Sequence, residues 1–436
     1  MKSIGTFLRV FSTLSISLAF MGFAQAALMM PSENLMRTVY SDSIDLLLKN
    51  LSRNDVSPGA VIASPSRSSP DYFYHWTRDA ALTHEGLFSL YEYTDDVNLK
   101  ERILNLAKDW IAFEIKTQSH AEYAEGGLGE PRFHVNGEVN TAEWGRPQND
   151  GPAARAITMS LWALKFLDEG EGTYVRDTLY HPLPAKTPIK MDLEYVAKHW
   201  REASVDLWEE VRGLHFYTLA MQRRSLILGA HLANRLNDVE GALYYSTEAN
   251  KIKTALDRFL NAGKPYIVAT LDQTGGWGHK QSGLDIAIII AANHALFEDE
   301  FFLSKKFMFT NTLAVLEERF DNIYSINRDA SLATAMGRYP EDVYDGVGFS
   351  GANPWFLATH ASAEYYCKLA HLERSPELAA SLKEKGLSFL ARTLKHRDQN
   401  TGEMSEQFSR YDGFLVGASH LTWSYASYIA AYQACH

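Results

Sequence analysis

Three carboxylates and a tryptophan fall within five residues, Asp206-Leu207-Trp208-Glu209-Glu210, near the middle of the 436-residue chain. In a helical turn Asp206 and Glu209 would share one face, and Glu210 would point elsewhere. A short acidic run is more often a solvated helix face than a site. One of these carboxyl groups could instead be kept protonated by Trp208 and by neighbouring negative charge, because both raise a carboxyl pKa. A protonated carboxyl group of this kind can act as a general acid.

A second carboxylate stands apart in the sequence Met404-Ser405-Glu406-Gln407, with Trp423 and Tyr425 just downstream. Hydrolysis of a glycosidic bond uses two carboxyl groups, one that gives a proton and one that activates water or attacks the sugar. The acidic run and Glu406 together therefore favour a sugar-hydrolysing site over a solvated surface patch.

An aromatic segment precedes the acidic run, at Asp71-Tyr72-Phe73-Tyr74-His75-Trp76-Thr77-Arg78-Asp79. Arg78 and Asp79 offer adjacent donors and acceptors for hydroxyl groups. The rings of Tyr72 and Trp76 could stack on a sugar or line its pocket. The alternative is an exposed helix start that Asp79 caps, but the number of aromatic rings exceeds what a cap needs.

Three further loops are less specific. The glycines of 126–132 and 144–151 imply tight turns or close approach to a ligand, and Trp144 could cover a sugar ring. In 337–344, Arg338 and Tyr344 could bind hydroxyl groups, although a single Arg–Tyr loop is more often structural. The loop 274–279 shows no clear chemistry.

The elements that must position these loops are predicted to be almost entirely helical. Apolar residues recur three to five positions apart, the pattern of an amphipathic helix, and the best strand candidate, 266–271, is short. Prolines at 152, 354 and 376 suit a first helical turn. The predicted helices cover 35–51, 97–114, 152–167, 217–236, 241–260, 301–320, 354–372, 376–394 and 417–432.

The polar and aromatic loops recur at a regular interval, centred roughly on residues 72, 135, 208, 275, 345 and 407. An interval of 62 to 73 residues accommodates two helices and their connections. Six helical hairpins that return their long loops to one end describe a closed double ring around a pocket. An open solenoid of helix pairs is the rival, but its repeats usually resemble one another in sequence.

Composition limits the possible partners. The net charge of −11 argues against a polyanionic partner such as nucleic acid, because phosphate binding needs clustered Lys and Arg. Zinc-type Cys/His spacing, a P-loop and a GxGxxG motif are absent, so we expect no cofactor and no metal. Cys367 and Cys435 are the two cysteines and could pair in an oxidising compartment.

The N-terminal segment 1–26 has the pattern of a secretory signal peptide. Lys2 and Arg9 precede an apolar stretch, and Ala24-Gln25-Ala26 fits the small-x-small cleavage pattern. An uncleaved anchor is the weaker alternative because the apolar run is short for a bilayer. We expect a secreted or periplasmic monomer, without a membrane span once the signal peptide is cleaved.

Nine segments closely resemble glucoamylases, members of glycoside hydrolase family 15, in order and spacing over nearly the whole of 27–436. The resemblance implies a single all-α catalytic domain, an (α/α)6 barrel with its site in a funnel at one end, and no appended starch-binding domain. The segments are GAVIASPS (59–66), DYFYHWTRDAAL (71–82), GLGEPRFHVNG (127–137), WGRPQNDGPA (144–153), DLWEEVRG (206–213), GRYPEDVY (337–344), NPWFLAT (353–359), SEQF (405–408) and LTWSYAS (421–427).

The resemblance also implies residue roles. Glu209 would be the general acid, Glu406 the general base that activates water, and Asp206 a supporting carboxylate that tunes Glu209. The terminal glucose would be held by Arg78, Asp79, Arg338 and the Leu207-Trp208 backbone, in a subsite lined by Tyr72, Trp76 and Trp423. Trp144, Glu210 and Tyr344 would shape that subsite and the next.

The implied activity is inverting hydrolysis of terminal α-1,4-linked glucose from non-reducing ends of starch, glycogen or maltooligosaccharides, slower on α-1,6 links, releasing β-D-glucose. An inverting pair of carboxyl groups lies ~6.5–9.5 Å apart to leave room for water, and an acidic pH profile would need Glu406 ionised and Glu209 protonated. Three departures from many relatives, Arg212 for Asn, His75 for Thr and a longer stretch at 345–350, leave linkage and chain length open. The alternatives are a preference for α-1,6 glucan or trehalose, or an inactive sugar-binding relative.

Overall fold

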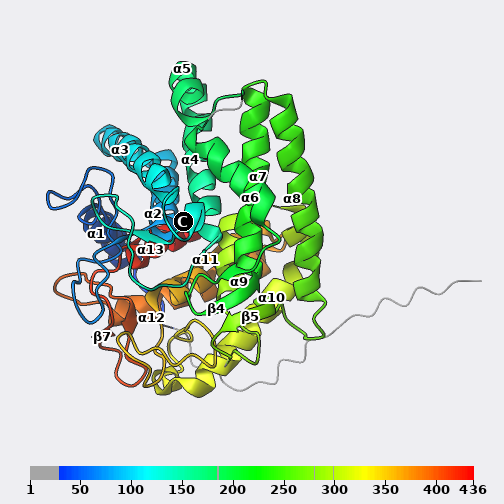
Figure 1. The fold of residues 1–436 in the computed structure, drawn as a ribbon. Coiled ribbons are helices and arrows are strands. Elements are labelled where there is room, and N and C mark those ends of the chain that lie inside the picture. The colour runs from blue at the N-terminus through cyan, green and yellow to red at the C-terminus, as the bar shows by residue number, and fades with distance from the viewer. Residues whose placement is uncertain (1–28, 184–185, 279, 298) are drawn as a thin grey trace, which may run out of the picture.

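The computed structural model describes residues 29–183, 186–278, 280–297 and 299–436. The expected signal peptide, 1–26, lies outside these residues. Within them the chain forms two concentric layers of helices (Figure 1). The inner layer consists of α2 (Thr77–Tyr93), α4 (Asp150–Asp168), α7 (Phe216–Arg235), α9 (Ala287–Ala291, continued by a turn over Ala292–Leu296), α11 (Phe356–Leu372) and α13 (Thr422–Cys435).

The outer layer alternates with the inner one along the chain, so the helices form six successive hairpins. Each inner helix packs against the next, and α13 packs against α2 to close the ring. The closed double ring predicted from the loop interval is therefore confirmed, and the open solenoid is excluded. The outer helices are α1 (Glu33–Leu48), α3 (Val97–Ala121), α6 (Pro188–His199), α8 (Val239–Leu260), α10 (Glu300–Ile323) and α12 (Pro376–His396); α5 (Gly172–Tyr174) is a short turn between α4 and α6.

The sequences of the two layers differ as their burial requires. In α11 every residue from Phe356 to Cys367 is buried. The side chains on all sides of this helix are therefore either apolar or hydrogen-bonded within the protein. Outer helix α8 instead buries one face and exposes the other, where Val239 is 70% and Leu243 69% exposed. An amphipathic stripe is the signature of a helix at a surface, which explains why the outer helices were the easier ones to predict.

Three helices were not predicted, each for a physical reason. Helix α9 is apolar on every side and has no periodic stripe, and α6 begins at Pro188, close after Pro182 and Pro184, which are typical of a loop. Helix α2 begins inside the segment taken as an aromatic loop. The predicted helix start at Pro354 was wrong because α11 begins at Phe356, whereas Pro376 is the first residue of α12, where its missing N–H costs nothing.

The connections are long at one end of the ring and short at the other. The segments that enter the inner helices are 49–76, 122–149, 200–215, 261–286, 324–355 and 397–421. Most connections that leave them span only three residues, such as 236–238 and 373–375. All six inner helices therefore direct their N-termini toward the end that carries the long loops.

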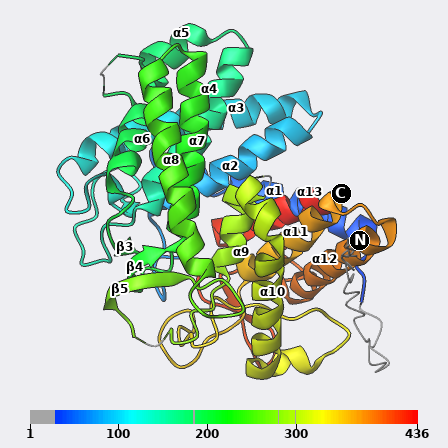
Figure 2. The ribbon, with the colours of Figure 1, turned by 90° about the vertical axis from the view of Figure 1, so that its right-hand side faces the viewer.

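Short antiparallel strands tie these loops together. Strands β3 (Ser204–Val205), β4 (Val211–His215) and β5 (Thr270–Gly276) form a sheet beside the start of α7 (Figure 2). The predicted strand 266–271 overlaps β5 only at its last two residues. Two further pairs link β1 (His75–Trp76) with β2 (Arg132–Phe133) and β6 (Gln407–Phe408) with β7 (Leu415–Val416).

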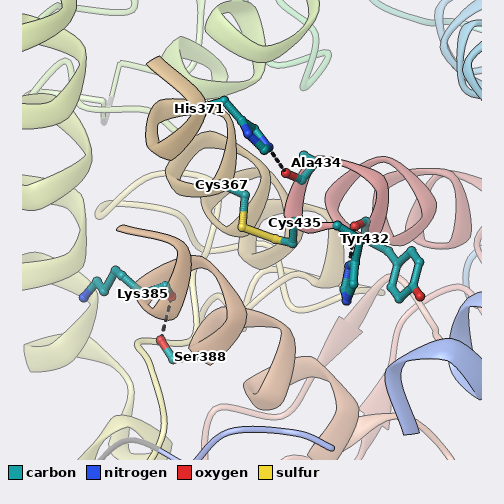
Figure 3. The surroundings of a disulfide bond; sticks show 8 residues. Cys367, His371, Lys385, Ser388, Tyr432, Ala434 and Cys435 are labelled. Carbon is teal, nitrogen blue, oxygen red and sulfur yellow. Dashed lines mark hydrogen bonds between the residues drawn. A yellow bond between two sulfur atoms is a disulfide. The ribbon is translucent and has the colours of Figure 1, made fainter. Parts of the chain in front are cut away.

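A disulfide joins two neighbouring inner helices. Cys367 of α11 and Cys435 of α13 have Cα atoms 5.0 Å apart, and His371 donates to the Ala434 carbonyl beside them (Figure 3). Gly386 of α12 faces Cys367 so closely that a Cβ atom there would lie 2.4 Å from its sulfur. The two cysteines are thus paired where three helices meet.

Over the same described ranges, no helix is both long enough and apolar enough to cross a bilayer.

Candidate active site

The six long loops surround a cavity of about 270 Å³ at the N-terminal ends of the inner helices. Every predicted site residue except Asp206 lines it. Five residues that were not predicted also line it: Ala63, Trp277, Phe349, Trp355 and Leu421. The predicted residues in the wall are Tyr72, Trp76, Arg78, Asp79, Trp144, Leu207, Trp208, Glu209, Glu210, Arg338, Tyr344, Glu406 and Trp423.

Glu209 and Glu406 reach the cavity from opposite sides of the ring. Glu209 belongs to the third long loop, which enters α7, and Glu406 belongs to the sixth, which enters α13. Three of six hairpins separate them in either direction around the closed ring. The two carboxyl groups therefore face each other across the pocket instead of lying side by side on one loop.

The acidic run is a tight turn between β3 and β4, and the expectation that Asp206 and Glu209 share a helical face was wrong. Glu209 has φ of +68°, a left-handed conformation that costs a non-glycine residue about 1–2 kcal/mol. Asp206 holds this turn, because its Oδ1 accepts the backbone N–H groups of Glu210 at 2.8 Å and Val211 at 3.0 Å. Backbone strain held in this way is typical of functional sites.

Asp206 is buried behind the cavity wall and contacts Lys280, whose Nζ lies 2.8 Å from its Oδ2. Burial raises the pKa of Asp206, but the charge of Lys280 and the hydrogen bonds outweigh it and lower the pKa to about 2. The side chain is therefore ionised, and its hydrogen bonds stabilise the turn. Lys280 was not predicted, since a single lysine in a loop carries no recognisable pattern.

The Glu209 carboxylate is hydrogen-bonded on one oxygen. The Trp76 indole N–H donates to Oε1 at 2.8 Å and the Gln148 amide at 3.0 Å, while Arg78 lies 3.8 Å from the same atom. No donor in the described part of the chain hydrogen-bonds Oε2, so the two oxygens of this carboxylate differ in their surroundings. The indole of Trp208, expected to influence Glu209, donates to Asp285 instead.

Glu406 occupies a drier environment. Its side chain is 1% exposed, the Tyr72 hydroxyl donates to Oε1 at 3.0 Å, and the Gln407 amide donates to Oε2 at 3.3 Å. Burial raises the pKa of Glu406 to about 8, against the opposing effects of Tyr72 and Arg338. Gly417 leaves room for this carboxylate, because a Cβ atom there would lie 2.5 Å from Oε2.

Arg78 and Asp79 form the polar floor of the cavity in the first turn of α2. Arg78 donates to Gln148 at 2.9 Å and Asp150 at 3.1 Å. Arg78 Nε and Asp79 Oδ2 lie 3.4 Å apart, yet neither completes a hydrogen bond with any residue that the structure describes. Burial raises the pKa of Asp79 to about 6, partly offset by Arg78. Both atoms are shielded from the cavity, and buried polar atoms without partners are rare.

Glu210 and Arg338 form the opposite wall. Arg338 binds Asp342 through two hydrogen bonds of 2.7 Å and reaches Glu210 at 2.7 Å. Tyr339 donates to the other oxygen of Glu210 at 2.6 Å. This network fixes the guanidinium at the cavity surface, where its remaining donor capacity faces a ligand.

Trp355 is the clearest residue that the sequence analysis missed. It immediately precedes α11, as Trp76 precedes α2, and its ring lies 5.7 Å from that of Trp208. Its position before an inner helix is a signal that would have identified it.

Two residues at which the sequence departs from many relatives, His75 and Arg212, have partners in the structure. His75 is buried and lies 2.8 Å from the Glu114 carboxylate, and Arg212 donates to the Arg146 carbonyl at 2.8 Å.

Among the residues that the structure describes, no group of three or more His, Cys, Asp and Glu side chains is arranged to hold a metal ion. The cavity lining is aromatic walls, two arginines and four acidic side chains. This combination suits a neutral, hydroxyl-rich ligand.

Comparison with known proteins agrees with this geometry. The family "Glycosyl hydrolases family 15" matches residues 43–433. "Glucoamylase 1" of Rhizopus oryzae is 36% identical over 422 residues, covering 88% of this chain and 68% of that relative. "Glucoamylase" of Blastobotrys adeninivorans is 33% identical, with the same coverage. The solved glucoamylase from Saccharomycopsis fibuligera superimposes with a TM-score of 0.82 at 29% identity, covering 95% of this chain and 98% of that one. The chain therefore belongs to glycoside hydrolase family 15 and is a glucoamylase-like hydrolase with the (α/α)6 barrel fold.

Proposed function

We propose that this enzyme removes terminal glucose from the non-reducing ends of α-1,4 glucans with inversion, more slowly at α-1,6 links, and releases β-D-glucose. The observation that carries the proposal is the placement of Glu209 and Glu406 on opposite hairpins of the ring, in one cavity. Two carboxyl groups that flank a glycosidic bond are what its hydrolysis needs, and inversion requires them to lie ~6.5–9.5 Å apart so that water fits between the base and the sugar.

In the proposed reaction Glu209 is the general acid. Because Trp76 and Gln148 both donate to its Oε1, the proton resides on Oε2 and passes to the glycosidic oxygen as the bond to the anomeric carbon breaks. Glu406 accepts a proton from a water molecule, and the oxygen of that water attacks the anomeric carbon from the opposite face. The burial that raises the pKa of Glu406 makes its ionised form a strong base. Asp206 supports the reaction by holding the turn on which Glu209 sits.

Exo action follows from binding of the terminal unit at Arg78 and Asp79. Both residues line the cavity, and only 6% and 14% of their side-chain surfaces are exposed. These two residues would bind hydroxyl groups of that unit, with Arg338 and the Leu207-Trp208 backbone on the other side. Tyr72, Trp76 and Trp423 would line this subsite, and Trp144, Glu210 and Tyr344 would shape it and the next.

The proposal is tested by NMR of the anomer first released from maltotetraose, with maltose, isomaltose and trehalose compared as substrates. We expect β-glucose initially and the highest kcat/KM on the α-1,4 substrates. Initial α-glucose would refute inversion, and a higher kcat/KM on isomaltose or trehalose would refute the proposed specificity.

We further propose that residues 1–26 are a cleaved leader and that 27–436 is the catalytic unit, delivered to an oxidising compartment. The Cys367–Cys435 disulfide supports this proposal, because such bonds persist mainly outside the reducing cytosol. N-terminal sequencing of the protein recovered from the culture medium or the periplasm tests it, with residue 27 expected first.

A further inference from the structure

Two aromatic rings meet at the outer rim of the cavity. Trp277 comes from the fourth long loop and Phe349 from the fifth, and their ring centroids lie 4.6 Å apart at 65°. Both line the cavity, yet Phe349 is 63% exposed. We call these two residues the rim pair. Arg78 and Asp79 line the same cavity but are far less exposed, at 6% and 14% of their side-chain surfaces.

The loop that carries Phe349 is held in one conformation. The Asp345 carboxylate accepts backbone N–H groups from Val347, Gly348 and Ser350 at 2.6 to 3.1 Å. The Asn353 amide donates to the Asp345 carbonyl at 3.3 Å. An exposed aromatic ring on a loop with so many internal hydrogen bonds is presented to solvent in a fixed position.

The backbone of Trp277 is also held by a hydrogen bond. Its N–H donates to the Glu210 carbonyl at 3.1 Å. The preceding residue, Gly276, has φ of +81° and passes so close that a Cβ atom would lie 2.1 Å from the same carbonyl oxygen. Only glycine fits there, and the close contact sets Trp277 directly beside the acidic turn.

Aromatic rings continue from the rim pair into the cavity. Tyr344 lies 6.4 Å from Phe349, and Trp355 lies 6.3 Å from Tyr344, measured between ring centroids. One wall of the pocket is therefore aromatic from the rim to the neighbourhood of Trp208. Such rings combine an apolar face with polar edges and suit the faces of sugar rings.

We propose that Trp277 and Phe349 form an outer subsite that binds a glucose unit of the α-glucan beyond the bond that is cut. This inference rests on the proposed function, since the chain direction follows from a terminal unit bound at Arg78 and Asp79. Because hydrogen bonds hold the loop backbones that carry both rings before binding, less ordering entropy opposes the contact than with free loops. The subsite gives the enzyme a preference for chains longer than maltose.

The experiment measures kcat/KM on maltose, maltotriose, maltotetraose and maltohexaose for the wild type and three variants. Wild-type kcat/KM rises with chain length. Phe349→Ala and Trp277→Ala each lower the ratio of the hexaose value to the maltose value by about three- to tenfold, the range for one aromatic contact. Phe307→Ala, which removes a 74% exposed phenylalanine on the outer helix α10, leaves the ratio unchanged.

A binding measurement separates this inference from the proposed function. Calorimetric titration of maltohexaose into Glu209→Gln, with and without Phe349→Ala, gives an affinity that does not depend on turnover. Weaker binding in the double variant supports the subsite even if no hydrolysis is found. Unchanged affinity together with an unchanged chain-length ratio overturns it, as does a wild type that shows no rise with length. Phe349→Tyr keeps a ring and should keep the ratio, which excludes a folding defect as the cause.

Discussion

The two sides of the cavity fix their carboxylates by different means. On the Glu209 side, ion pairs and backbone hydrogen bonds around Asp206, Lys280 and Arg338 hold a strained turn. On the Glu406 side, the carboxylate is enclosed by phenol rings and packed loops, and the adjoining helices are joined by a disulfide. Glu209 is partly exposed, whereas Glu406 is buried.

This difference matters because burial alone would suggest opposite roles. A carboxyl group with a raised pKa is usually the acid of a pair, and here burial raises the pKa of Glu406 to about 8. The hydrogen bonds favour the proposed roles instead, since both oxygens of Glu406 accept one, from Tyr72 and Gln407, whereas only Oε1 of Glu209 does. The assignment therefore depends on which oxygens are already hydrogen-bonded.

The sharpest test of this contrast uses a substrate that needs no acid. We expect Glu209→Gln and Glu406→Gln each to lower kcat on maltose by ~10²–10⁴-fold. On α-glucosyl fluoride, whose leaving group departs without a proton, Glu209→Gln should keep most of its activity and Glu406→Gln should not. Initial rates of fluoride release measure this. The reverse pattern would exchange the two roles.

A change of charge should damage the Glu209 side most. Replacing Lys280 by Met leaves the buried carboxylates of Asp206 and Asp285 without their cation. Removal of one partner from a buried ion pair costs about 3–5 kcal/mol, so we expect this loss in the free energy of unfolding, measured by urea denaturation. Lys186→Met removes the exposed pair with Glu122 and should cost at most about 1 kcal/mol. Equal effects of the two variants would contradict the contrast.

Reduction should affect the Glu406 side. The disulfide joins residues 68 apart, and loss of such a crosslink costs about 2–4 kcal/mol through the entropy of the unfolded chain. We expect Cys367→Ala/Cys435→Ala to lower Tm and to remove any further effect of dithiothreitol, both measured by thermal scans. A double variant whose Tm still falls in reductant would show another reducible element.

The smallest effect concerns pH. Tyr72 donates to Glu406 and lowers a pKa that burial raises. Without that donor the pKa of Glu406 rises further, so in Tyr72→Phe the pH below which kcat falls should move upward. Profiles of kcat against pH for both proteins measure the shift, and a downward shift would mean that Tyr72 does not act on Glu406.

The sequence was sufficient for the architecture because two periodicities repeat along it. Outer helices show an apolar stripe, and their long loops recur at a nearly constant interval, so the ring follows before any contact is known. Helix α9 was not predicted because a helix surrounded by protein needs no apolar stripe. The expected helical turn at 206–210 was wrong because backbone hydrogen bonds to the Asp206 side chain favour a tight turn.

The site residues were predictable where they cluster in sequence and unpredictable where only the fold brings them together. Arg78, Asp79 and Trp76 lie in one short segment, and all of them line the cavity. Lys280 and Phe349 come from loops without a distinctive pattern, and their importance depends on neighbours 74 and 72 residues away, Asp206 and Trp277. Long-range partners of this kind cannot be read from local spacing.

Closure of the ring has a consequence for folding during synthesis. Helix α13 packs against both α2 and α11, and it is made after the other five inner helices. Until it emerges from the ribosome, the faces of α2 and α11 that it covers are open to solvent. The hydrogen bond that the Gln433 amide donates to the Tyr40 hydroxyl of α1 is also missing. The last inner helix thus completes the core in one step, and a chain stalled before residue 422 would expose surface that favours aggregation.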